Sequence, residues 1–401
     1  MKKFALNIFA LGVIAAAFTS CNDAKYDAIE NRVYIAEAAA KPLSEIVMGD
    51  EGSVMTAPVT VRLAQATDHT VTVKLHISQA NLDAYNKLNQ TTYEMVPEQY
   101  VSIPTEAVIN PGEVSTTVPV QITAFKGEGG VEYALSMALY DATGMEITET
   151  SSKFIYALAA PLKQYVPGFQ WNNGCRLQPD NTDWDLSLTN YTLEWWSNVN
   201  GYSINNQAIF ANGGSPELYI RFGDLIYSSG GRYMNNFLQV KTFGGQFDSG
   251  NPTTGNGLEP GTWYHFALTY DAATGVSLLY KNGAQIAQLA TAAGQPMIIN
   301  HLNMFDSGSQ YFRDIVQMAQ VRLWNVTRTP DQIATFMRKE VKFNDPNLIF
   351  YLPMSEIVEI DGKNAFMDVT GHGHNMIIGV GGENSSNNDV ASWTEVDFSS
   401  I

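Results

Sequence analysis

The chain has 401 residues, of which 45% are hydrophobic, and its formal net charge is −17 at pH 7. A surface this acidic repels nucleic acid and anionic lipid, so neither is expected as a partner, and a polyanionic ligand is disfavoured as well. The two cysteines are Cys21 and Cys175. They suggest no disulfide framework, so a hydrophobic core has to supply the stability.

Residues 1–20 have the pattern of an export signal. Lys2 and Lys3 precede an apolar run from Phe4 to Phe18, which is shorter than the roughly 20 apolar residues of a membrane span. The small residues before Cys21 resemble the lipobox of bacterial lipoproteins. This resemblance implies that residues 1–20 are removed and that acyl chains on Cys21 are the only membrane anchor. Ordinary secretion with cleavage nearby is the alternative.

Residues 21–30 are expected to form a tether. The acidic stretch after Cys21, which includes Asp23 and Asp27, resembles the surface-export signal of Gram-negative bacteria that degrade glycans. The resemblance implies a lipid-anchored protein of the outer membrane that faces the cell exterior.

Residues 31–160 show the alternation of short strands. Apolar residues recur at every second position in runs such as Val59–Leu63, Val71–Ile77 and Leu135–Leu139, which places one face of each strand in a core. A short helix is expected between Asn81 and Asn89. About seven strands in this length predict an immunoglobulin-like sandwich.

This half of the chain resembles an uncharacterised N-terminal domain of surface lipoproteins from glycan-utilisation systems. The residues that carry the resemblance are Tyr85-Asn86, Tyr93, Val96–Tyr100 and Ile109–Glu113. The resemblance implies a spacer or platform and assigns no chemistry to any residue. Residues 161–168, which contain two prolines, are expected to link this domain to a second one at residues 169–401.

The second half contains several motifs in the order found in laminin-G-like jelly rolls. The most specific is Leu258–Asp271, with the sequence Leu-Glu-Pro-Gly-Thr-Trp-Tyr-His before Ala267, Thr269 and Tyr270. The other motifs are Tyr191–Trp196, Leu279–Gly283, Val321–Asn325, Thr329–Ile333, Leu348–Met354 and Asp368–Gly373. The resemblance implies an all-β chain whose second domain is a concanavalin-A-like, laminin-G-type sandwich. Trp196, Trp263 and Trp324 are expected in its core, and His265 is expected to be buried.

No catalytic group is recognised. Glycosidases with this fold use a carboxylate pair on one strand face, and the nearest match is Glu359-Ile-Asp361. Lys363 and Asn364 follow it, so the acid/base glutamate is missing, and Asp361-Gly362 indicates a turn. His372 and His374 are a weak candidate for metal ligands because no third ligand follows at a suitable spacing. The sequence therefore predicts a protein that is not an enzyme.

Four loops combine aromatic rings with amide or guanidinium groups, the side chains that bind neutral sugars, and ordinary exposed turns are the alternative. They span residues 178–185, 198–207, 230–236 and 306–314. The candidate glycan-binding residues are Trp184, Tyr202, Asn205, Asn206, Arg232, Tyr233, Asn235, Asn236, Asp306 and Tyr311. Trp184, Tyr202 and Tyr233 are predicted to be exposed stacking rings.

No cofactor is expected, although calcium is possible at the rim because laminin-G-like folds often hold it. Asp180, Asp183, Asp185 and Asp306 are the possible oxygen donors. The leading hypothesis is a non-catalytic glycan-binding lipoprotein that captures oligosaccharide for an outer-membrane importer and its glycosidases. The alternatives are an adhesion or structural lipoprotein that binds a protein partner and, with less support, a glycoside hydrolase.

Overall fold

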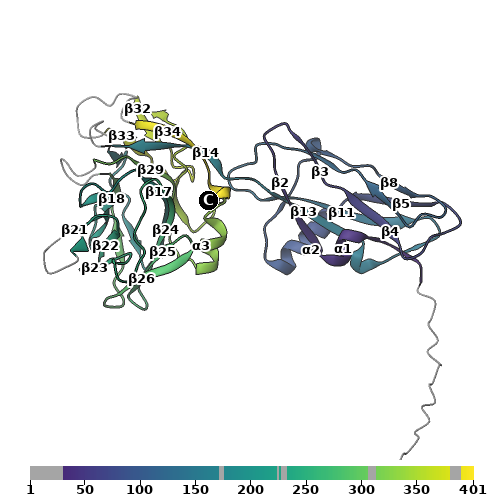
Figure 1. Cartoon of the computed structure of the whole chain (residues 1–401), viewed down its shortest axis with the longest axis horizontal. Helices are drawn as coiled ribbons and strands as arrows, with labels where there is room; N and C mark the ends of the chain where they lie inside the picture. Colours follow the sequence, from purple (N-terminus) through teal and green to yellow (C-terminus); the bar gives the residue numbers. More distant parts are fainter. Residues whose placement is uncertain (1–29, 171–175, 224, 227–232, 306–312, 380–389) are drawn as a thin grey trace, which may run out of the picture.

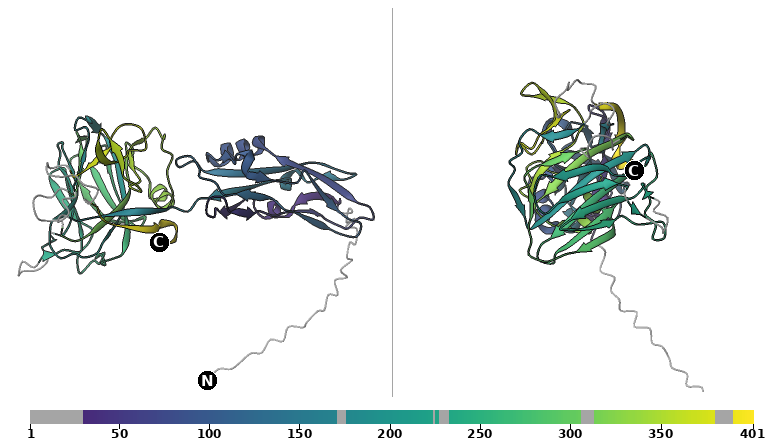
Figure 2. Two further views of the ribbon diagram at one scale, coloured as in Figure 1. Left: turned by 90° about the horizontal axis from the view of Figure 1, so that it is seen from above. Right: turned by 90° about the vertical axis from the view of Figure 1, so that its left-hand side faces the viewer.

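The structure is a computed structural model that describes residues 30–401 except 171–175, 224, 227–232, 306–312 and 380–389. The described chain forms two β-sandwiches that lie end to end (Figure 1) and are joined by a narrow connection (Figure 2). The described chain begins at the end of the first sandwich that points away from the second. Among the described residues, no helix is long and apolar enough to cross a membrane.

The first sandwich contains short strands in three sheets. The strands are β1 (Arg32–Ile35), β2 (Leu43–Val47), β3 (Val54–Thr56), β4 (Val59–Leu63), β5 (Val71–Ile77), β6 (Glu94–Met95), β7 (Val101–Ser102), β8 (Glu106–Ile109), β9 (Ser115–Val118), β10 (Gln121–Thr123), β11 (Tyr133–Ala142), β12 (Glu146–Ile147) and β13 (Lys153–Ala159). The sheet orders are β12-β1-β4-β9, β3-β10-β7 and β2-β13-β11-β5-β8, and β6 pairs with β11.

The predicted alternation is confirmed in this sandwich. Val59, Val61 and Leu63 of β4 are fully buried in a single hydrophobic core, whereas Arg62 between them is exposed. Two α-helices accompany the strands, α1 (Ala36–Ala40) and α2 (Gln79–Asn89). The second is the predicted helix, which begins where the Ser78 hydroxyl accepts a hydrogen bond from the Asn81 backbone N–H.

The described residues of the second sandwich form two large sheets and two small ones. The strands are β14 (Lys163–Phe169), β15 (Leu177–Pro179), β16 (Leu186–Leu188), β17 (Asn190–Val199), β18 (Gln207–Asn212), β19 (Leu218–Phe222), β20 (Leu225–Ile226), β21 (Tyr233–Met234), β22 (Leu238–Thr242), β23 (Gly245–Asp248), β24 (Trp263–Asp271), β25 (Val276–Lys281), β26 (Ala284–Ala290), β27 (Met297–Ile299), β28 (Leu302–Met304), β29 (Val316–Trp324), β30 (Leu348–Leu352), β31 (Val358–Ile360), β32 (Lys363–Phe366), β33 (Met376–Ile378) and β34 (Val390–Asp397).

The two large sheets enclose the main core. The eight-stranded sheet has the order β26-β25-β24-β17-β29-β14-β34, with β30 beside β29, and the nine-stranded sheet has the order β23-β22-β19-β18-β28-β15-β33-β32-β31. On β17, Tyr191, Leu193 and Trp195 point into this core. Alternation then places Glu194 and Trp196 on the opposite face of the sheet. There, Trp196 Nε1 donates to the carbonyl oxygen of Met337, which follows α3 (Pro330–Phe336).

Two predictions need correction. Trp196 and Trp324 are buried, but they belong to clusters on the outer face of the eight-stranded sheet, where Trp263 also packs. The predicted linker at residues 161–168 is too long. Lys163–Phe169 forms β14, which pairs with β34 and β29, so only the residues around Pro161 connect the two sandwiches.

Candidate ligand-binding face of the second sandwich

The outer face of the nine-stranded sheet carries an ordered group of polar side chains. On β19, Leu218, Ile220 and Phe222 point into the core, so the alternate residues Tyr219 and Arg221 lie on the outer face, where both are half-buried. In Figure 1, β18, β22 and β23 form the side of the molecule that lies away from the first sandwich, and none of the described α-helices covers them. The right-hand view of Figure 2 looks toward this side.

Arg221 is at the centre of this group. Its guanidinium donates from Nε and Nη2 to Oε1 of Gln239, at 2.9 and 2.5 Å, and from Nη1 to Oδ1 of Asn206 at 2.7 Å. Gln239 in turn donates from Nε2 to Oδ1 of Asp248 at 2.9 Å. These bonds come from four different segments of chain, so each polar group has a fixed direction before any ligand arrives.

An aromatic ring lies within the same group. The Tyr219 hydroxyl donates to Oδ1 of Asn206 at 3.2 Å, and the guanidinium of Arg221 lies 5.5 Å from the centre of the Tyr219 ring. Lys241 Nζ lies 6.0 Å from the same ring and forms an ion pair of 3.3 Å with Glu217. Guanidinium, amide and carboxylate groups beside a ring are suited to bind hydroxyl groups together with an apolar C–H surface.

Described residues of three of the four predicted loops lie close together at the Arg221 end of β19. Asp314 Oδ2 accepts hydrogen bonds from the Ser203 backbone N–H at 2.7 Å and from Nε2 of Gln207 at 2.8 Å, which ties loop 306–314 to loop 198–207. Asn235 Nδ2 donates to the Tyr202 carbonyl oxygen at 3.3 Å, which adds loop 230–236. Parts of three loops chosen from the sequence therefore lie beside this candidate face.

The predicted residues of these loops have different roles. Asn206 is part of the Arg221 group. Asn205 lies against Gly223, since a Cβ atom added to Gly223 would be 2.8 Å from the Cα atom of Asn205. Asn236 donates to the Leu258 carbonyl oxygen at 3.3 Å. Among the described residues, Oδ1 of Asn235 is buried without a hydrogen-bond partner.

Tyr202 differs from its prediction as an exposed stacking ring. It packs edge-on against Phe222, with ring centres 5.7 Å apart, and is only partly accessible. Burial raises the pKa of its hydroxyl group, and the neighbouring Tyr264, Glu259 and Asp314 act in the same direction. Its ring therefore supports the loop, and its backbone carbonyl holds Asn235.

The prediction for Trp184 as an exposed ring is wrong. Trp184 is 8% exposed and packs against His374 and Phe350, with ring centres 4.5 and 5.6 Å away. The Trp184 backbone N–H donates to the Asn300 carbonyl oxygen. Asn300 is near the Asn212 end of β18, and the Arg221 group is at the other end of that strand. A tryptophan in this environment contributes to the core.

Four predicted residues lie outside the described residues: Cys21, Arg232, Asp306 and Tyr311. For Tyr233 only the strand β21 is described. Their roles remain predictions.

The suggested calcium donors do not converge in the described part of the chain. Among the described residues, no three histidine, cysteine, aspartate or glutamate side chains lie close enough to hold a metal ion. Asp180 instead accepts a hydrogen bond from Asn375 at 2.9 Å, and the rings of His372 and His374 both face the Ile349 carbonyl oxygen through Nδ1. Calcium thus remains a prediction that depends on Asp306.

The segment closest to a glycosidase motif is a hairpin turn, as predicted. Glu359 lies on β31 and pairs with Asn364 of β32. Asp361 occupies the turn between these strands, with φ of 51°. Both carboxylates are exposed, and no paired carboxylate lies opposite them in the hairpin.

The strand residues Tyr219, Arg221, Gln239 and Asp248 are not among the residues predicted from the loops. The signal was present in Leu-Tyr-Ile-Arg-Phe and Leu-Gln-Val-Lys-Thr, because strict alternation places the polar residues together on one sheet face. What the sequence did not show was the pairing of β19 with β22, which sets Arg221 directly opposite Gln239.

Comparison with known families agrees with this architecture. Residues 172–334 match the family model of the concanavalin A-like lectin/glucanases superfamily, of laminin-G type. The second sandwich is a concanavalin A-like domain. Residues 29–146 match a second family model, which describes an N-terminal domain. No curated protein matches the sequence.

One solved structure shares the fold over nearly the whole chain. A Bacteroides ovatus protein that is thought to bind carbohydrate aligns with a TM-score of 0.66 and 21% identity, over 91% of this chain and 97% of that one. Two other similarities are more limited. A Bacteroides thetaiotaomicron protein with a Man5GlcNAc product has 22% identity over 32% of this chain and 30% of that one, at a TM-score of 0.26. A SAP-like pentraxin from Limulus polyphemus has 14% identity over 44% of this chain and 83% of that one, at 0.32.

Proposed function

We propose that this chain is a non-catalytic, cell-surface lipoprotein whose concanavalin A-like domain binds a neutral oligosaccharide at the Arg221 face. The observation that carries the proposal is the pre-oriented Arg221–Gln239–Asn206 group beside the Tyr219 ring. A rigid strand scaffold holds these groups, and described residues of three loops contact one another at the same end of β19. Such a site loses little conformational entropy when a sugar binds.

Two further points support glycan binding. The fold hosts many lectins, although fold alone does not determine function. The similar protein from Bacteroides ovatus, which matches nearly the full length of both chains, is itself thought to bind carbohydrate. The proposal extends that function to this chain because the polar face supplies the appropriate chemistry.

The proposed location follows from the N-terminal sequence. Acyl chains on Cys21 would hold the protein in the outer membrane, and the acidic residues after it favour the exterior side. The Arg221 face lies at the end of the molecule away from the start of the described chain. A ligand captured there would be passed to an outer-membrane importer and to glycosidases.

A screen of the chain from residue 22 to residue 401 against a glycan array tests this function. The expected result is selective binding of one class of neutral glycan, with no new reducing ends after prolonged incubation. Turnover that disappears when a carboxylate is replaced would make the protein a glycosidase. An array without a hit, together with a protein ligand that competes at the Arg221 face, would support the adhesion alternative.

A further inference from the structure

The two sandwiches meet through backbone packing. The turn at residues 127–130 of the first sandwich lies against residues 341–343 of the second. A Cβ atom on Gly130 would lie 1.9 Å from the Val341 carbonyl oxygen, and one on Gly129 would lie 2.1 Å from the Phe343 ring. The Phe343 backbone N–H also donates to the Gly129 carbonyl oxygen at 3.3 Å. At this contact, the backbone of the first sandwich lies so close to residues 341–343 that there is no room for a Cβ atom on Gly129 or Gly130.

Ion pairs flank this contact. Lys339 Nζ lies 3.2 Å from Oε1 of Glu132, and Lys342 Nζ lies 3.6 Å from Oε1 of Glu94. Both lysines belong to the second sandwich and both glutamates to the first. The pairs are partly exposed, so they contribute orientation more than free energy.

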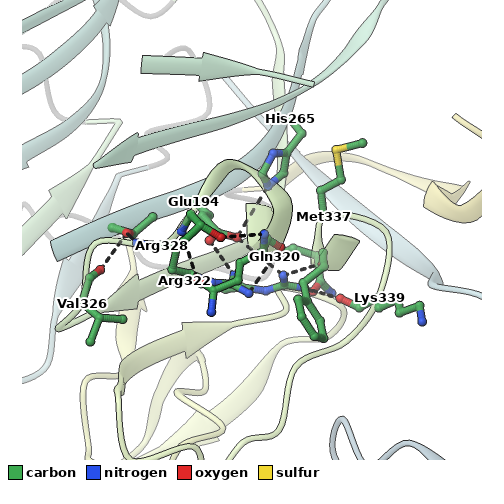
Figure 3. A network of polar contacts seen from close by, with 12 residues as sticks. Glu194, His265, Gln320, Arg322, Val326, Arg328, Met337 and Lys339 are labelled. Atoms are coloured by element: carbon green, nitrogen blue, oxygen red, sulfur yellow. Dashed lines mark hydrogen bonds and ion pairs between the residues drawn. The ribbon is translucent and has the colours of Figure 1, made fainter. Parts of the chain in front are cut away.

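A buried cluster in the second sandwich fixes the segment that makes these contacts (Figure 3). Arg322 donates to the carbonyl oxygens of Phe336 and Lys339, at 3.0 and 2.6 Å. Trp196 Nε1 donates to the Met337 carbonyl oxygen at 2.6 Å. These donors lie on β29 and β17, so three hydrogen bonds tie residues 336–339 to the large sheet.

A cavity of about 450 Å³ lies beside this contact, between the two sandwiches. This volume falls within the range of small-ligand sites, roughly 300–1,000 Å³. Its charged lining consists of three lysines and three glutamates, which are Lys126, Lys163, Lys339, Glu128, Glu132 and Glu340. The balance of charge favours a neutral polar ligand over a polyanion.

Aromatic rings continue from the cavity onto the adjacent strand pair. Tyr165 of β14 lines the cavity and is 58% exposed. On the same face, Trp393 of β34 lies opposite Pro167 and is 40% exposed. Residues opposite each other in an antiparallel pair share a face, so the rings of Tyr165 and Trp393 lie on the same face of this strand pair, at the end where Tyr165 lines the cavity.

We propose that this surface, the junction site, is a second binding site for a neutral oligosaccharide. This inference rests on the proposed function and extends it. The terminal sugar would enter the cavity, where lysine and glutamate side chains bind its hydroxyl groups. The following sugars would stack on Tyr165 and Trp393. The chain would then hold two sites, one at the Arg221 face and one between the sandwiches.

Isothermal titration of the chain from residue 22 to residue 401 tests the junction site. The probes are neutral hexasaccharides of glucose, mannose, galactose and xylose. The expected result for at least one probe is two equivalents bound. Tyr165→Ala combined with Trp393→Ala should leave the equivalent at the Arg221 face unchanged. The same double variant should weaken binding at the junction site by about 5- to 150-fold, which corresponds to loss of at least one stacking ring. Arg221→Ala combined with Gln239→Ala should instead weaken binding at the Arg221 face and leave the equivalent at the junction site unchanged.

Two controls separate binding from folding. Tyr140→Ala removes a tyrosine of the first sandwich that is 56% exposed, and it should leave two equivalents. Tyr165→Phe keeps the ring and should preserve binding at the junction site. Unchanged stoichiometry and affinity in the Tyr165/Trp393 double variant would overturn the junction site and leave the proposed function intact. Absence of binding by every probe would overturn both.

Discussion

The guanidinium of Arg328 lies 2.7 Å from the carboxylate of Glu194, and both side chains are buried on the outer face of the eight-stranded sheet. Arg322 lies 3.8 Å from the same carboxylate. The cluster therefore holds two guanidinium groups around one carboxylate, in a place that water does not reach. Removal of the carboxylate would leave both cations without their common counter-ion.

Glu194→Ala should lower the free energy of unfolding of the second sandwich by about 3–5 kcal/mol, because it leaves buried charge uncompensated. Urea unfolding followed by tryptophan fluorescence measures this change. Glu217→Ala is the matched control, since Glu217 pairs with Lys241 at the surface and should cost no more than about 1 kcal/mol. Similar losses for both variants would refute the role given to the buried cluster.

His265 should make stability depend on pH. Burial and the nearby Arg322 and Arg328 hold the pKa of His265 well below its ordinary value. The folded chain therefore keeps this imidazole neutral, while the unfolded chain takes up a proton as the pH falls through about 6.5. The contribution to stability is complete above that pH and is lost progressively below it.

Replacement by a group that does not titrate checks this assignment. His265→Gln should flatten the fall in unfolding free energy between about pH 7.5 and pH 5, measured by urea unfolding at each pH. His76→Gln, at an exposed position of the first sandwich, should leave the pH profile as it is. If both variants follow the native profile, another group controls the pH dependence.

Arg221→Ala should weaken glycan binding at the outer sheet face by about 1.5–3 kcal/mol, because a hydrogen bond to a charged group contributes in this range. Its loss also removes hydrogen bonds that help to fix the directions of Gln239 and Asn206. Titration of the glycan identified on the array gives the affinity. Arg62→Ala removes an exposed arginine of β4 and should not change the affinity for the glycan. Native affinity in the Arg221 variant would place the binding site elsewhere.

Gly130→Ala should displace the two sandwiches relative to each other. Gly130 has φ of 68°, and an added Cβ would collide with the Val341 carbonyl oxygen. Gly144→Ala is a close control, because Gly144 has φ of 69° but nothing within 4 Å of an added Cβ. Both variants carry the same backbone strain, so only the Gly130 variant should change the small-angle X-ray scattering profile. Identical profiles would show that the contact is not rigid.

Cys21→Ala should release the protein from the membrane fraction, because Cys21 is the predicted site of the acyl chains. Detergent-phase partitioning of cell extracts, followed by immunoblotting, measures the anchored fraction. Ser20→Ala keeps a small residue before the cysteine and should stay in the detergent phase. A Cys21 variant that still partitions into detergent would contradict lipidation at this residue.

Local patterns in the sequence predicted much of the fold. The alternation in β4 and β5 and the motif around Trp263 depend on residues close together in the chain, and these identified both sandwiches. The bounds of the linker were harder to predict. Pro161 and Pro167 both indicate a break in regular structure, although Pro167 lies within β14. β14 meets β29 only at Gly168 and Phe169, so most of the strand is paired on one side alone, where proline is tolerated.

The candidate site was predicted in part for the same reason. Turn-forming and polar residues marked the loops, and described residues of three of them lie close together near Arg221. Whether a loop aromatic faces solvent depends on distant residues, however. Trp184 is buried by Phe350 and His374, which lie more than 160 positions away in the chain, and nothing near Trp184 in the sequence indicates this packing.

The pairing of β14 with β34 affects the order in which the second sandwich can be completed during synthesis. Lys163–Phe169 leaves the ribosome long before its partner Val390–Asp397. Until then, one edge of β14 is open and can pair with another chain. Phe398, which is fully buried, and its backbone bond to Leu162 come later still. A chain shortened before Val390 would keep this unpaired strand edge, so premature termination should give aggregation-prone fragments instead of a smaller folded protein.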